Sequence, residues 1–353
     1  MALEGTVLEV SSISCTVDTQ EGLYECAARG RLKESDIEER SPLVVGDRVR
    51  IEKTGQNEGV VLERFDRETR LCRTHPSDPR TRHVIIANVD QLLIVSSVRE
   101  PELGVGIIDR YVIAALYGDL TPLICINKID LAENSSEYLN IVQIYRDLDY
   151  EVVCTSAETG EGIEQLKDLL RDKSTVLAGH SGVGKSSLIN KIQPGLNLKT
   201  APIGWKGTHC TSSIRLIKLD IGGYVADTPG VRELDPWDIE KYEVQQFYPE
   251  IWERAPGCRM PDCSHVHEPD CAVQKAVEEG EIPQLRYDSY LSIIESIERE
   301  FEPRRTDVDK PSRQVKKEKR EPSRRTRKQE LQERFEEEIE NWRRQREEGQ
   351  QPG

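Results

Sequence analysis

Long apolar runs are missing from this sequence of 353 residues. No stretch approaches the roughly 18 consecutive apolar residues of a membrane-spanning helix, and aromatic residues make up only 5% of the chain. The opening residues, MALEGTVLEV, lack the basic flank and the apolar core of a signal peptide. We therefore expect a cytoplasmic protein without contact to a membrane.

The cysteine count is odd, since the chain has nine. Cys125 and Cys154 lie in runs typical of buried strands, whereas others gather in a short segment after Gly257. Disulfide frameworks belong to secreted chains with paired cysteines. Reduced thiols together with a metal site fit this distribution better.

Positive charge is in deficit as well. The formal net charge of -15 disfavours non-specific binding of nucleic acid by the whole chain. The average hides a local excess, because residues 301–330 hold 12 Lys and Arg against 6 Asp and Glu, while residues 1–72 hold 10 against 15. Contact with RNA would therefore have to use local patches.

The first part of the chain, residues 1–72, has the pattern of a small β-barrel. Five short β-rich runs, from GTVLEV to EGVVLERF, are separated by turn signals such as QEG and GQNEG. Five strands in about 65 residues is the size of an OB-fold, although another small β-domain would give the same pattern. The next segment, RETRLCRTHPSDPRTRH, carries five Arg and two Pro and predicts an extended basic linker or a solvated connector.

Three further regions follow. Residues 73–235 alternate apolar strand-like runs with helical segments, which predicts an α/β domain with a parallel sheet covered by helices; IRLIKLD and GGYVADTPG predict two paired strands near its end. Residues 236–300 hold a cysteine cluster and a helical stretch, so we expect a zinc-binding α-helical domain. Residues 301–353 predict a disordered charged segment and then an apolar stripe from Leu331 to Trp342, either a helix docked on a partner or a marginal lone helix.

A phosphate-binding loop is indicated by GHSGVGKS, which fits G-x-x-x-x-G-K-[ST] between a strand-like and a helix-like run. Its backbone N–H groups can point at phosphate oxygens, and the following helix directs its positive end at the anion. Lys185 would neutralise the β and γ phosphates, and Ser186 would bind magnesium. Asp227, at the end of an apolar strand, has the position of a magnesium-site carboxylate, and the N–H of Gly230 could sense the γ phosphate. The predicted phosphate contacts are Gly179, His180, Ser181, Gly182, Val183, Gly184, Lys185, Ser186 and Ser187.

The nucleotide base is indicated by NKID, which also follows a strand-like run. Asn127 can hydrogen-bond a purine, and the stem of Lys128 can cover the ring. Asp130 can accept the N1–H and 2-amino hydrogens of guanine; adenine has neither donor, so a buried Asp130 would be left unpaired against ATP. The run TSA, at the end of another strand, would supply backbone contacts to the base. The predicted base contacts are Asn127, Lys128, Ile129, Asp130, Ser156 and Ala157.

The base loop precedes the phosphate loop, which reverses the usual order of these motifs. Ligands of an open parallel sheet bind at the carboxyl ends of its strands. The site therefore depends on which loops converge there and not on the order in which the chain visits them. Joining the usual chain ends and cutting elsewhere leaves such a site intact, so the sequence predicts a circularly permuted P-loop GTPase domain.

In these motifs and their order the chain resembles the RsgA family, the circularly permuted GTPases of small ribosomal subunit biogenesis. The resemblance covers about residues 5–300 and rests on IIDRYV, NKIDL, TSAETGEGI, GHSGVGKSSLIN, KGTHCTSS, DTPGVRE and the cysteine cluster. It implies GTP and GDP as ligands with Mg²⁺, activation by the small ribosomal subunit, and contact with its rRNA. One departure concerns the family's switch segment G-x-H-T-T, in which Cys210 replaces the first threonine. We favour Thr211 as the magnesium-sensing hydroxyl.

The water-orienting glutamine that many GTPases carry after D-x-x-G is Val231 here, and a valine cannot hold water. Intrinsic hydrolysis should therefore be slow. Either His209, in the switch segment, or a group from a partner would supply the polar function; a merely solvated His209 is the alternative. The candidate catalytic residues are His209, Lys185 and Thr211.

A metal site is indicated by CRMPDCSHVHEPDC, a C-x4-C-x-H-x5-C pattern. Three thiolates and one imidazole at short spacing form a closed tetrahedral zinc site with no open position for water, which is typical of a structural site. His267 could compete with His265, but the family pattern favours His265. We expect one zinc ion per chain, held by Cys258, Cys263, His265 and Cys271.

The resulting hypothesis is a monomeric GTPase that docks on the small ribosomal subunit through the barrel, the linker and the zinc domain, acts in late maturation and leaves after hydrolysis. Two alternatives remain. One is a GTP-gated RNA-binding module whose hydrolysis is incidental. The other is an ATP-dependent P-loop enzyme such as a kinase, which Asp130 opposes.

Overall fold

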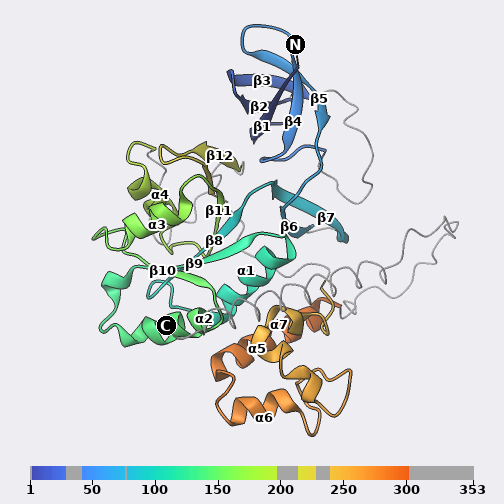
Figure 1. Ribbon diagram of the computed structural model, residues 1–353, viewed down its shortest axis with the longest axis vertical. Coiled ribbons are helices and arrows are strands. Elements are labelled where there is room, and N and C mark those ends of the chain that lie inside the picture. Colours follow the sequence, from blue (N-terminus) through green and yellow to red (C-terminus); the bar gives the residue numbers. More distant parts are fainter. Residues whose placement is uncertain (1, 29–41, 76–77, 197–213, 228–238, 302–353) are drawn as a thin grey trace, which may run out of the picture. The chain divides into compact units, whose positions relative to one another are not determined.

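The computed structural model describes residues 2–28, 42–75, 78–196, 214–227 and 239–301 (Figure 1). The chain divides into a compact unit, residues 1–299, and a second unit, residues 300–353. The predicted tail helix lies in the second unit, outside the described residues. Among the described helices, none is both long and apolar enough to cross a membrane.

The N-terminal strands close into a barrel. They pair in the order β1-β2-β3-β5-β4, and β4 pairs back with β1. Inward positions alternate along each strand, as expected for a sheet with one buried face, and Val7, Val17 and Ile51 are fully buried. The predicted five-stranded barrel is therefore confirmed. Its strands are β1 (Ala2–Val10), β2 (Ser14–Thr19), β3 (Gly22–Ala28), β4 (Arg48–Lys53) and β5 (Glu58–Arg64).

The predicted basic linker is a β-hairpin rather than a solvated connector. Strands β6 (Arg70–His75) and β7 (Asp78–Ala87) form a separate two-stranded antiparallel sheet. The sequence reading assigned the apolar end of β7 to the α/β sheet, but this end instead pairs with β6, where Leu71 and Ile86 face each other and are fully buried. Burial of these two side chains explains why the segment is paired and not free.

A buried ion pair joins this segment to the barrel. Arg67 donates from Nε to Oδ1 of Asp47 at 2.7 Å and from Nη2 to Oδ2 at 2.9 Å, and both side chains are at most 2% exposed. Asp47 also accepts the backbone N–H of Val44 at 2.7 Å. The bidentate geometry and the third hydrogen bond compensate the desolvation of the two charges.

The α/β region contains the predicted parallel sheet, in the order β10-β9-β8-β11-β13-β12. Its first five strands are parallel, and β12 runs antiparallel to β13, as the paired runs near residue 220 predicted. Consecutive residues of each strand alternate between two cores, one shared with helices α1 and α2 and the other with α3 and α4. The strands are β8 (Gln91–Ser97), β9 (Thr121–Asn127), β10 (Glu151–Cys154), β11 (Ser174–Ala178), β12 (Arg215–Lys218) and β13 (Tyr224–Asp227). The helices are α1 (Val105–Tyr117), α2 (Ser136–Asp147), α3 (Ile163–Leu170) and α4 (Lys185–Ile192), with a short 3-10 helix η1 (Ile129–Leu131) after β9.

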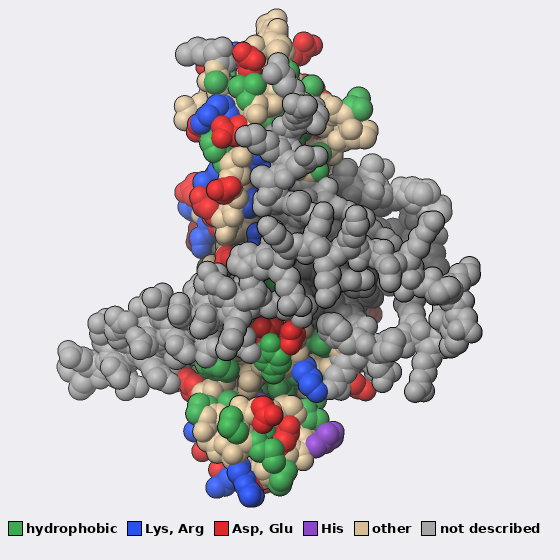
Figure 2. Space-filling model, turned by 90° about the vertical axis from the view of Figure 1, so that its right-hand side faces the viewer, with side chains coloured by type: hydrophobic (Ala, Val, Ile, Leu, Met, Phe, Trp, Pro, Cys, Tyr) green, Lys and Arg blue, Asp and Glu red, His purple; other side chains and the backbone are tan. Residues whose placement is uncertain are grey.

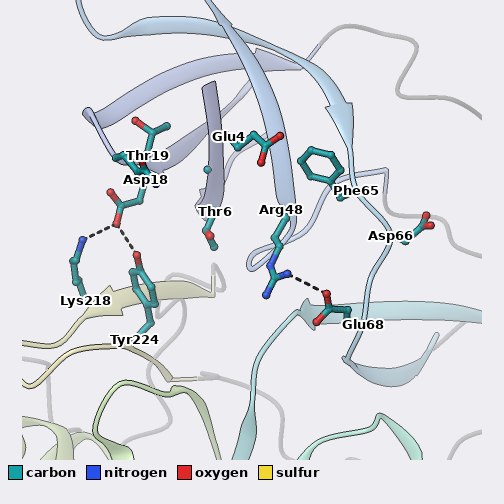
Figure 3. A pocket seen from close by; sticks show the side chains of 12 residues that line it. Glu4, Thr6, Asp18, Thr19, Arg48, Phe65, Asp66, Glu68, Lys218 and Tyr224 are labelled. Atoms are coloured by element: carbon teal, nitrogen blue, oxygen red, sulfur yellow. Dashed lines mark hydrogen bonds and ion pairs between the residues drawn. The ribbon is translucent and has the colours of Figure 1, made fainter. Parts of the chain in front are cut away.

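The barrel continues this sheet through β12. Glu9 of β1 is the antiparallel partner of Arg215. Beside this contact, Asp18 accepts hydrogen bonds from the hydroxyl of Tyr224 at 2.7 Å and from Nζ of Lys218 at 3.0 Å, at the wall of a cavity of about 700 Å³ (Figure 3). On the face shown in Figure 2, acidic and basic side chains of the barrel lie interspersed, in agreement with the mixed composition of residues 1–72.

The C-terminal part of the described chain is helical, as predicted for the region around the cysteines. Its longest helix, α7 (Gln284–Phe301), matches the predicted helical stretch. The shorter elements were not foreseen, because turns of three to seven residues carry no detectable period. They are η2 (Val244–Phe247), α5 (Pro249–Trp252), η3 (Ala255–Gly257) and α6 (Ala272–Glu278).

Candidate nucleotide site and metal cluster

Three loops that follow parallel strands meet at Asn127, the last residue of β9. Its Nδ2 donates to the carbonyl of Val183 in the predicted phosphate loop at 2.8 Å. Its Oδ1 accepts from Oγ1 of Thr155 at 3.1 Å and from the backbone N–H of Ala157 at 3.2 Å, both after β10. The side chain is 1% exposed. Asn127 therefore joins the base loop to the phosphate loop, and its predicted contact with the purine stays a prediction.

Asp130 is held in place by a neighbouring loop. Oγ of Ser156, a fully buried residue, donates to Oδ1 of Asp130 and accepts the N–H of Thr159 at 3.0 Å. The sequence reading gave Ser156 only backbone contacts and so missed this side-chain role. Asp130 itself is exposed and not buried as we expected, which leaves its carboxylate accessible to a ligand. Ile129 is buried beneath it and donates its N–H to the carbonyl of Thr155 at 3.2 Å.

The predicted phosphate loop needs glycine at two positions for steric reasons. Gly179 has φ 142°, and a Cβ there would lie 2.1 Å from the carbonyl oxygen of Val95. Gly184 has φ 98°, and a Cβ would lie 2.4 Å from Nδ2 of Asn127. Both conformations are ones that L side chains rarely adopt. The glycines therefore allow the close approach of the base loop and the turn into α4.

Lys185 opens α4 and folds back over this loop. Its Nζ donates to the carbonyl oxygens of Gly179 at 2.7 Å and His180 at 3.0 Å. Ser186 and Ser187 stand in the same first turn, where the backbone N–H groups of a helix attract anions. This arrangement provides an ammonium group and a helix N-terminus on one side of the phosphate loop.

A cavity of about 540 Å³ joins the two predicted loops. Its size is in the range of small-ligand sites. Lys128 borders it, with its backbone in the left-handed region and Nζ donating to the carbonyl of Glu100 at 2.5 Å. The structure thus brings base-loop and phosphate-loop residues to one cavity. Its lining residues are Asn127, Lys128, Asp130, Leu131, Ala157, Glu158, Gly184, Ser187, Asn190 and Lys191.

Four other predicted site residues cannot be placed in full: three lie outside the described residues, and for Asp227 only the backbone is described. His209, Thr211 and Gly230 are in undescribed segments. The backbone of Asp227 ends β13 next to Leu177 of β11, one residue from the strand end that leads to the phosphate loop. Their predicted roles toward magnesium and the γ phosphate stay predictions.

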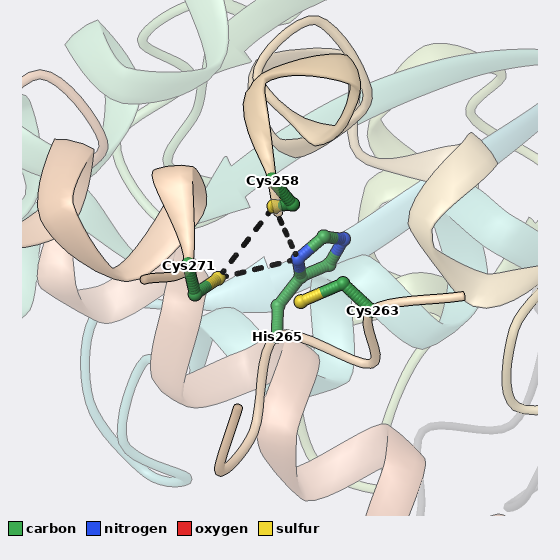
Figure 4. A group of neighbouring side chains, drawn as sticks. All are labelled: Cys258, Cys263, His265 and Cys271. Carbon is green, nitrogen blue, oxygen red and sulfur yellow. Dashed lines mark hydrogen bonds between the residues drawn. The ribbon is translucent and has the colours of Figure 1, made fainter. Parts of the chain in front are cut away.

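The four predicted metal ligands form one cluster (Figure 4). Their ligand atoms all lie within 4.8 Å of one another, and three of the four residues are buried. Nδ1 of His265 faces Sγ of Cys258 at 3.5 Å and Sγ of Cys271 at 3.4 Å. His267 is exposed and outside the cluster. Three sulfurs and one imidazole nitrogen at these separations fit a tetrahedral metal ion.

Burial favours the neutral forms of Cys263, His265 and Cys271. It raises the pKa of the Cys263 thiol to about 12 and lowers the pKa of His265, against a smaller opposing effect of Glu268. A cation that binds thiolates reverses the preference at the sulfurs and is favoured by a neutral imidazole. The electrostatics therefore suit a metal ion and not a free thiolate cluster.

The loop that carries His265 is fixed by groups that the cysteine spacing did not reveal. The carbonyl of His265 accepts from the hydroxyl of Tyr287 at 2.6 Å, and the carbonyl of Ser264 accepts from the hydroxyl of Tyr290 at 2.9 Å. Both tyrosines lie on α7. The only available sequence signal was their spacing of three residues, which places them on one face of a helix.

The carboxylate of Glu268 closes the same loop. It accepts hydrogen bonds from Oγ of Ser264 at 2.6 Å, from the N–H of Ser264 at 2.8 Å and from the N–H of His267 at 3.1 Å. Burial raises the pKa of Glu268, but these hydrogen bonds outweigh it and lower the pKa to about 2. The charged form therefore stabilises the folded loop.

We expect Glu268→Gln to reduce the free energy of unfolding by about 1–2 kcal/mol at pH 7, since Gln keeps one neutral acceptor oxygen and its NH2 group cannot accept the hydrogen bonds that the second carboxylate oxygen accepts. A depressed folded-state pKa gives stability that is present above pH 4.5 and is lost as the pH falls toward 2. The difference between wild type and variant should therefore shrink over this range in urea unfolding. Glu278→Gln, at an exposed carboxylate, is the control with no expected change; a constant difference at all pH values would refute the assignment.

Two family models match the chain: RsgA GTPase over residues 64–237 and RsgA N-terminal domain over residues 4–61. The chain is 42% identical over 292 residues to the small ribosomal subunit biogenesis GTPase RsgA of Caldanaerobacter subterraneus, covering 82% of this chain and 93% of that protein. It is 35% identical over 302 residues to the protein of the same name from Bacteroides fragilis, covering 84% and 97%.

Two solved structures resemble this one. YjeQ from Thermotoga maritima has a TM-score of 0.69 and 36% identity, with 84% of this chain and 99% of that chain covered. YloQ, described as a circularly permuted GTPase, has a TM-score of 0.66 and 33% identity, with 86% and 97% covered. The fold and the permuted order of the motifs are therefore shared with these proteins.

Proposed function

Because this chain belongs to the RsgA GTPase family and is therefore a GTP hydrolase, we propose that it acts in the biogenesis of the small ribosomal subunit. The observation that carries the proposal is the bond between Asn127 and Val183, which joins a guanine-type base loop to a phosphate loop at one cavity. Relatives that the chain matches over more than nine tenths of their length are named for this role.

In this proposal GTP occupies the cavity with its base toward Asp130 and its phosphates toward α4. The aliphatic stem of Lys128 covers the base. Lys185 exchanges its contacts with the loop carbonyls for the β and γ phosphates, a change that its long side chain permits. The proposed ligands of a magnesium ion, which would neutralise phosphate charge, are Ser186, Thr211 and Asp227.

Hydrolysis should be slow without a partner. Val231 provides no hydrogen bond to an attacking water, and His209 or a group of the small subunit is the proposed substitute. The proposed domains are 1–72, 73–235, 236–300 and 301–353. We propose that a cytoplasmic monomer docks on the small subunit and its rRNA, acts late in maturation and leaves after hydrolysis.

The cluster of Cys258, Cys263, His265 and Cys271 is the proposed site of one structural zinc ion. All four donors are protein groups, so a tetrahedral ion there has no position left for water or substrate. Elemental analysis should give about one zinc per chain, and less after Cys263→Ser.

GTP turnover measured with and without purified small ribosomal subunits tests the function. We expect at least tenfold stimulation by small subunits and none by large subunits, with Lys185→Ala inactive in both cases. Unchanged turnover accompanied by tight, GTP-dependent binding to RNA would instead identify a GTP-gated RNA-binding module.

A further inference from the structure

The imidazole of His265 has a hydrogen-bond partner on the side away from the cysteines. Nε2 of His265 lies 2.8 Å from Oε1 of Gln245 in η2. Nδ1, on the opposite side of the ring, faces the sulfurs of Cys258 and Cys271. One nitrogen of the ring thus faces thiols, and the other faces a single amide.

The amide of Gln245 is itself oriented. Its Nε2 donates to the carbonyl of Tyr242 at 3.0 Å. This bond uses the donor end of the amide, so the oxygen end is the one presented to His265. An oxygen acceptor requires a proton on Nε2 of the imidazole, and a neutral ring with that proton has its lone pair on Nδ1. The described contacts therefore select the tautomer of His265 that carries its proton on Nε2.

The other hydrogen bonds of His265 are made by its backbone, and its ring also lies 6.3 Å from the ring centre of Tyr290, a contact that selects neither ring nitrogen. Its carbonyl accepts from Tyr287 at 2.6 Å and from Nε2 of Gln274 at 3.2 Å. The residue has φ 61°, which the loop maintains. Among the described residues, the groups within hydrogen-bond distance of the ring are the sulfurs of Cys258 and Cys271 and the amide of Gln245.

We propose that Gln245 is a positioning residue for the metal cluster, which selects Nδ1 of His265 as the ligand atom. The proposal rests on the zinc site proposed above. Hydrogen-bonded partners of a metal-bound imidazole hold its tautomer and its orientation, and their removal typically costs ten- to a hundredfold in metal affinity. Because Gln245 lies in η2, its hydrogen bond also connects the cluster to η2.

Competition between the full-length protein and a chromogenic chelator for Zn²⁺ tests the proposal. We expect Gln245→Leu to bind Zn²⁺ about 10- to 100-fold more weakly than wild type. Gln245→Glu keeps an acceptor oxygen and should stay within about threefold of wild type. Gln284→Leu is the matched control and should show no change, because it makes the same substitution at an exposed position of α7, where the amide donates to Asp288 and does not contact the cluster.

Nitrogen-15 NMR of the zinc-loaded protein supplies a readout that loss of stability alone would not move. In wild type Nε2 of His265 should carry a proton protected from exchange with water, and this protection should be lost in Gln245→Leu. Equal zinc affinity of wild type and Gln245→Leu, equal weakening in both Gln245 variants, or zinc on Nε2 in wild type would overturn the positioning role. Absence of zinc binding by wild type would overturn the zinc proposal together with it.

Discussion

Asp130→Asn is expected to weaken GTP binding by about 100- to 1000-fold and to strengthen binding of xanthosine triphosphate. The carboxylate offers two acceptors to the N1–H and 2-amino group of guanine. Loss of one charged acceptor and the clash of the new amide N–H with the 2-amino group together cost about 3–4 kcal/mol, at 1.4 kcal/mol for each tenfold change. Xanthine has a carbonyl at this position, to which the amide can donate.

Equilibrium titration with fluorescent GTP and xanthosine triphosphate measures the exchange of preference. Asp168→Asn, on the exposed face of α3, is the matched control and should leave both affinities unchanged. Ser156→Ala removes the hydrogen bond that holds Asp130 and should weaken GTP binding by about tenfold without a gain for xanthosine triphosphate. Unaltered GTP affinity in Asp130→Asn would contradict the assignment of the base loop.

The meeting of the base loop and the phosphate loop at one cavity could be predicted from the sequence, because each motif is local. Each loop occupies a few consecutive residues after an apolar strand, so spacing alone indicated Asp130 and Lys185. The parallel sheet then required the loops to converge whatever their order in the chain. Spacing likewise indicated a cysteine and histidine cluster, but it left His265 and His267 as alternatives, and the family pattern favoured His265.

The supporting contacts could not be predicted in this way, because they join residues far apart in sequence. Asn127 and Val183 are separated by 56 positions, and Gln245 and His265 by 20. Glutamine or asparagine in isolation has no pattern that reveals its partner. The β6 and β7 hairpin was missed for a related reason, since the many charges near Arg70 obscured the pairing of two apolar residues.

The largest such omission is Arg286, which is 177 positions from its partner Asp109. Arg286 is on α7, Asp109 is on α1, and a second acid, Glu250, is on α5. Arg286 donates to Asp109 through Nη1 and to Glu250 through Nε at 2.6 Å, and its guanidinium lies 4.4 Å from the ring centre of Tyr248. All three charged side chains are at most 9% exposed. One buried cation is thus paired with two buried anions. It connects helix α1 of the GTPase domain to helices α5 and α7 of the C-terminal helical part.

Removal of the cation should be strongly destabilising. Burial raises the pKa of Asp109, and Arg286 opposes that effect. In Arg286→Met the opposing charge is gone and two acids remain buried, so we expect a loss of about 3–5 kcal/mol in the free energy of unfolding by urea at pH 7.5. Arg254→Met, at an exposed pair with Glu281, should change it by less than about 0.5 kcal/mol.

The pH dependence separates an unpaired charge from a simple packing defect. In Arg286→Met the folded-state pKa of Asp109 lies further above its unfolded value, so the variant is most stable below the unfolded value and loses stability as the pH rises through this window. Its deficit against wild type should therefore be smaller at pH 5 than at pH 8. The triple variant with Asp109→Asn and Glu250→Gln removes both anions and should recover most of the loss, because the amide oxygen at position 109 can still accept the hydrogen bond from the hydroxyl of Tyr145. A triple variant as unstable as Arg286→Met, with a deficit independent of pH, would show that the arginine acts by packing and not by its charge.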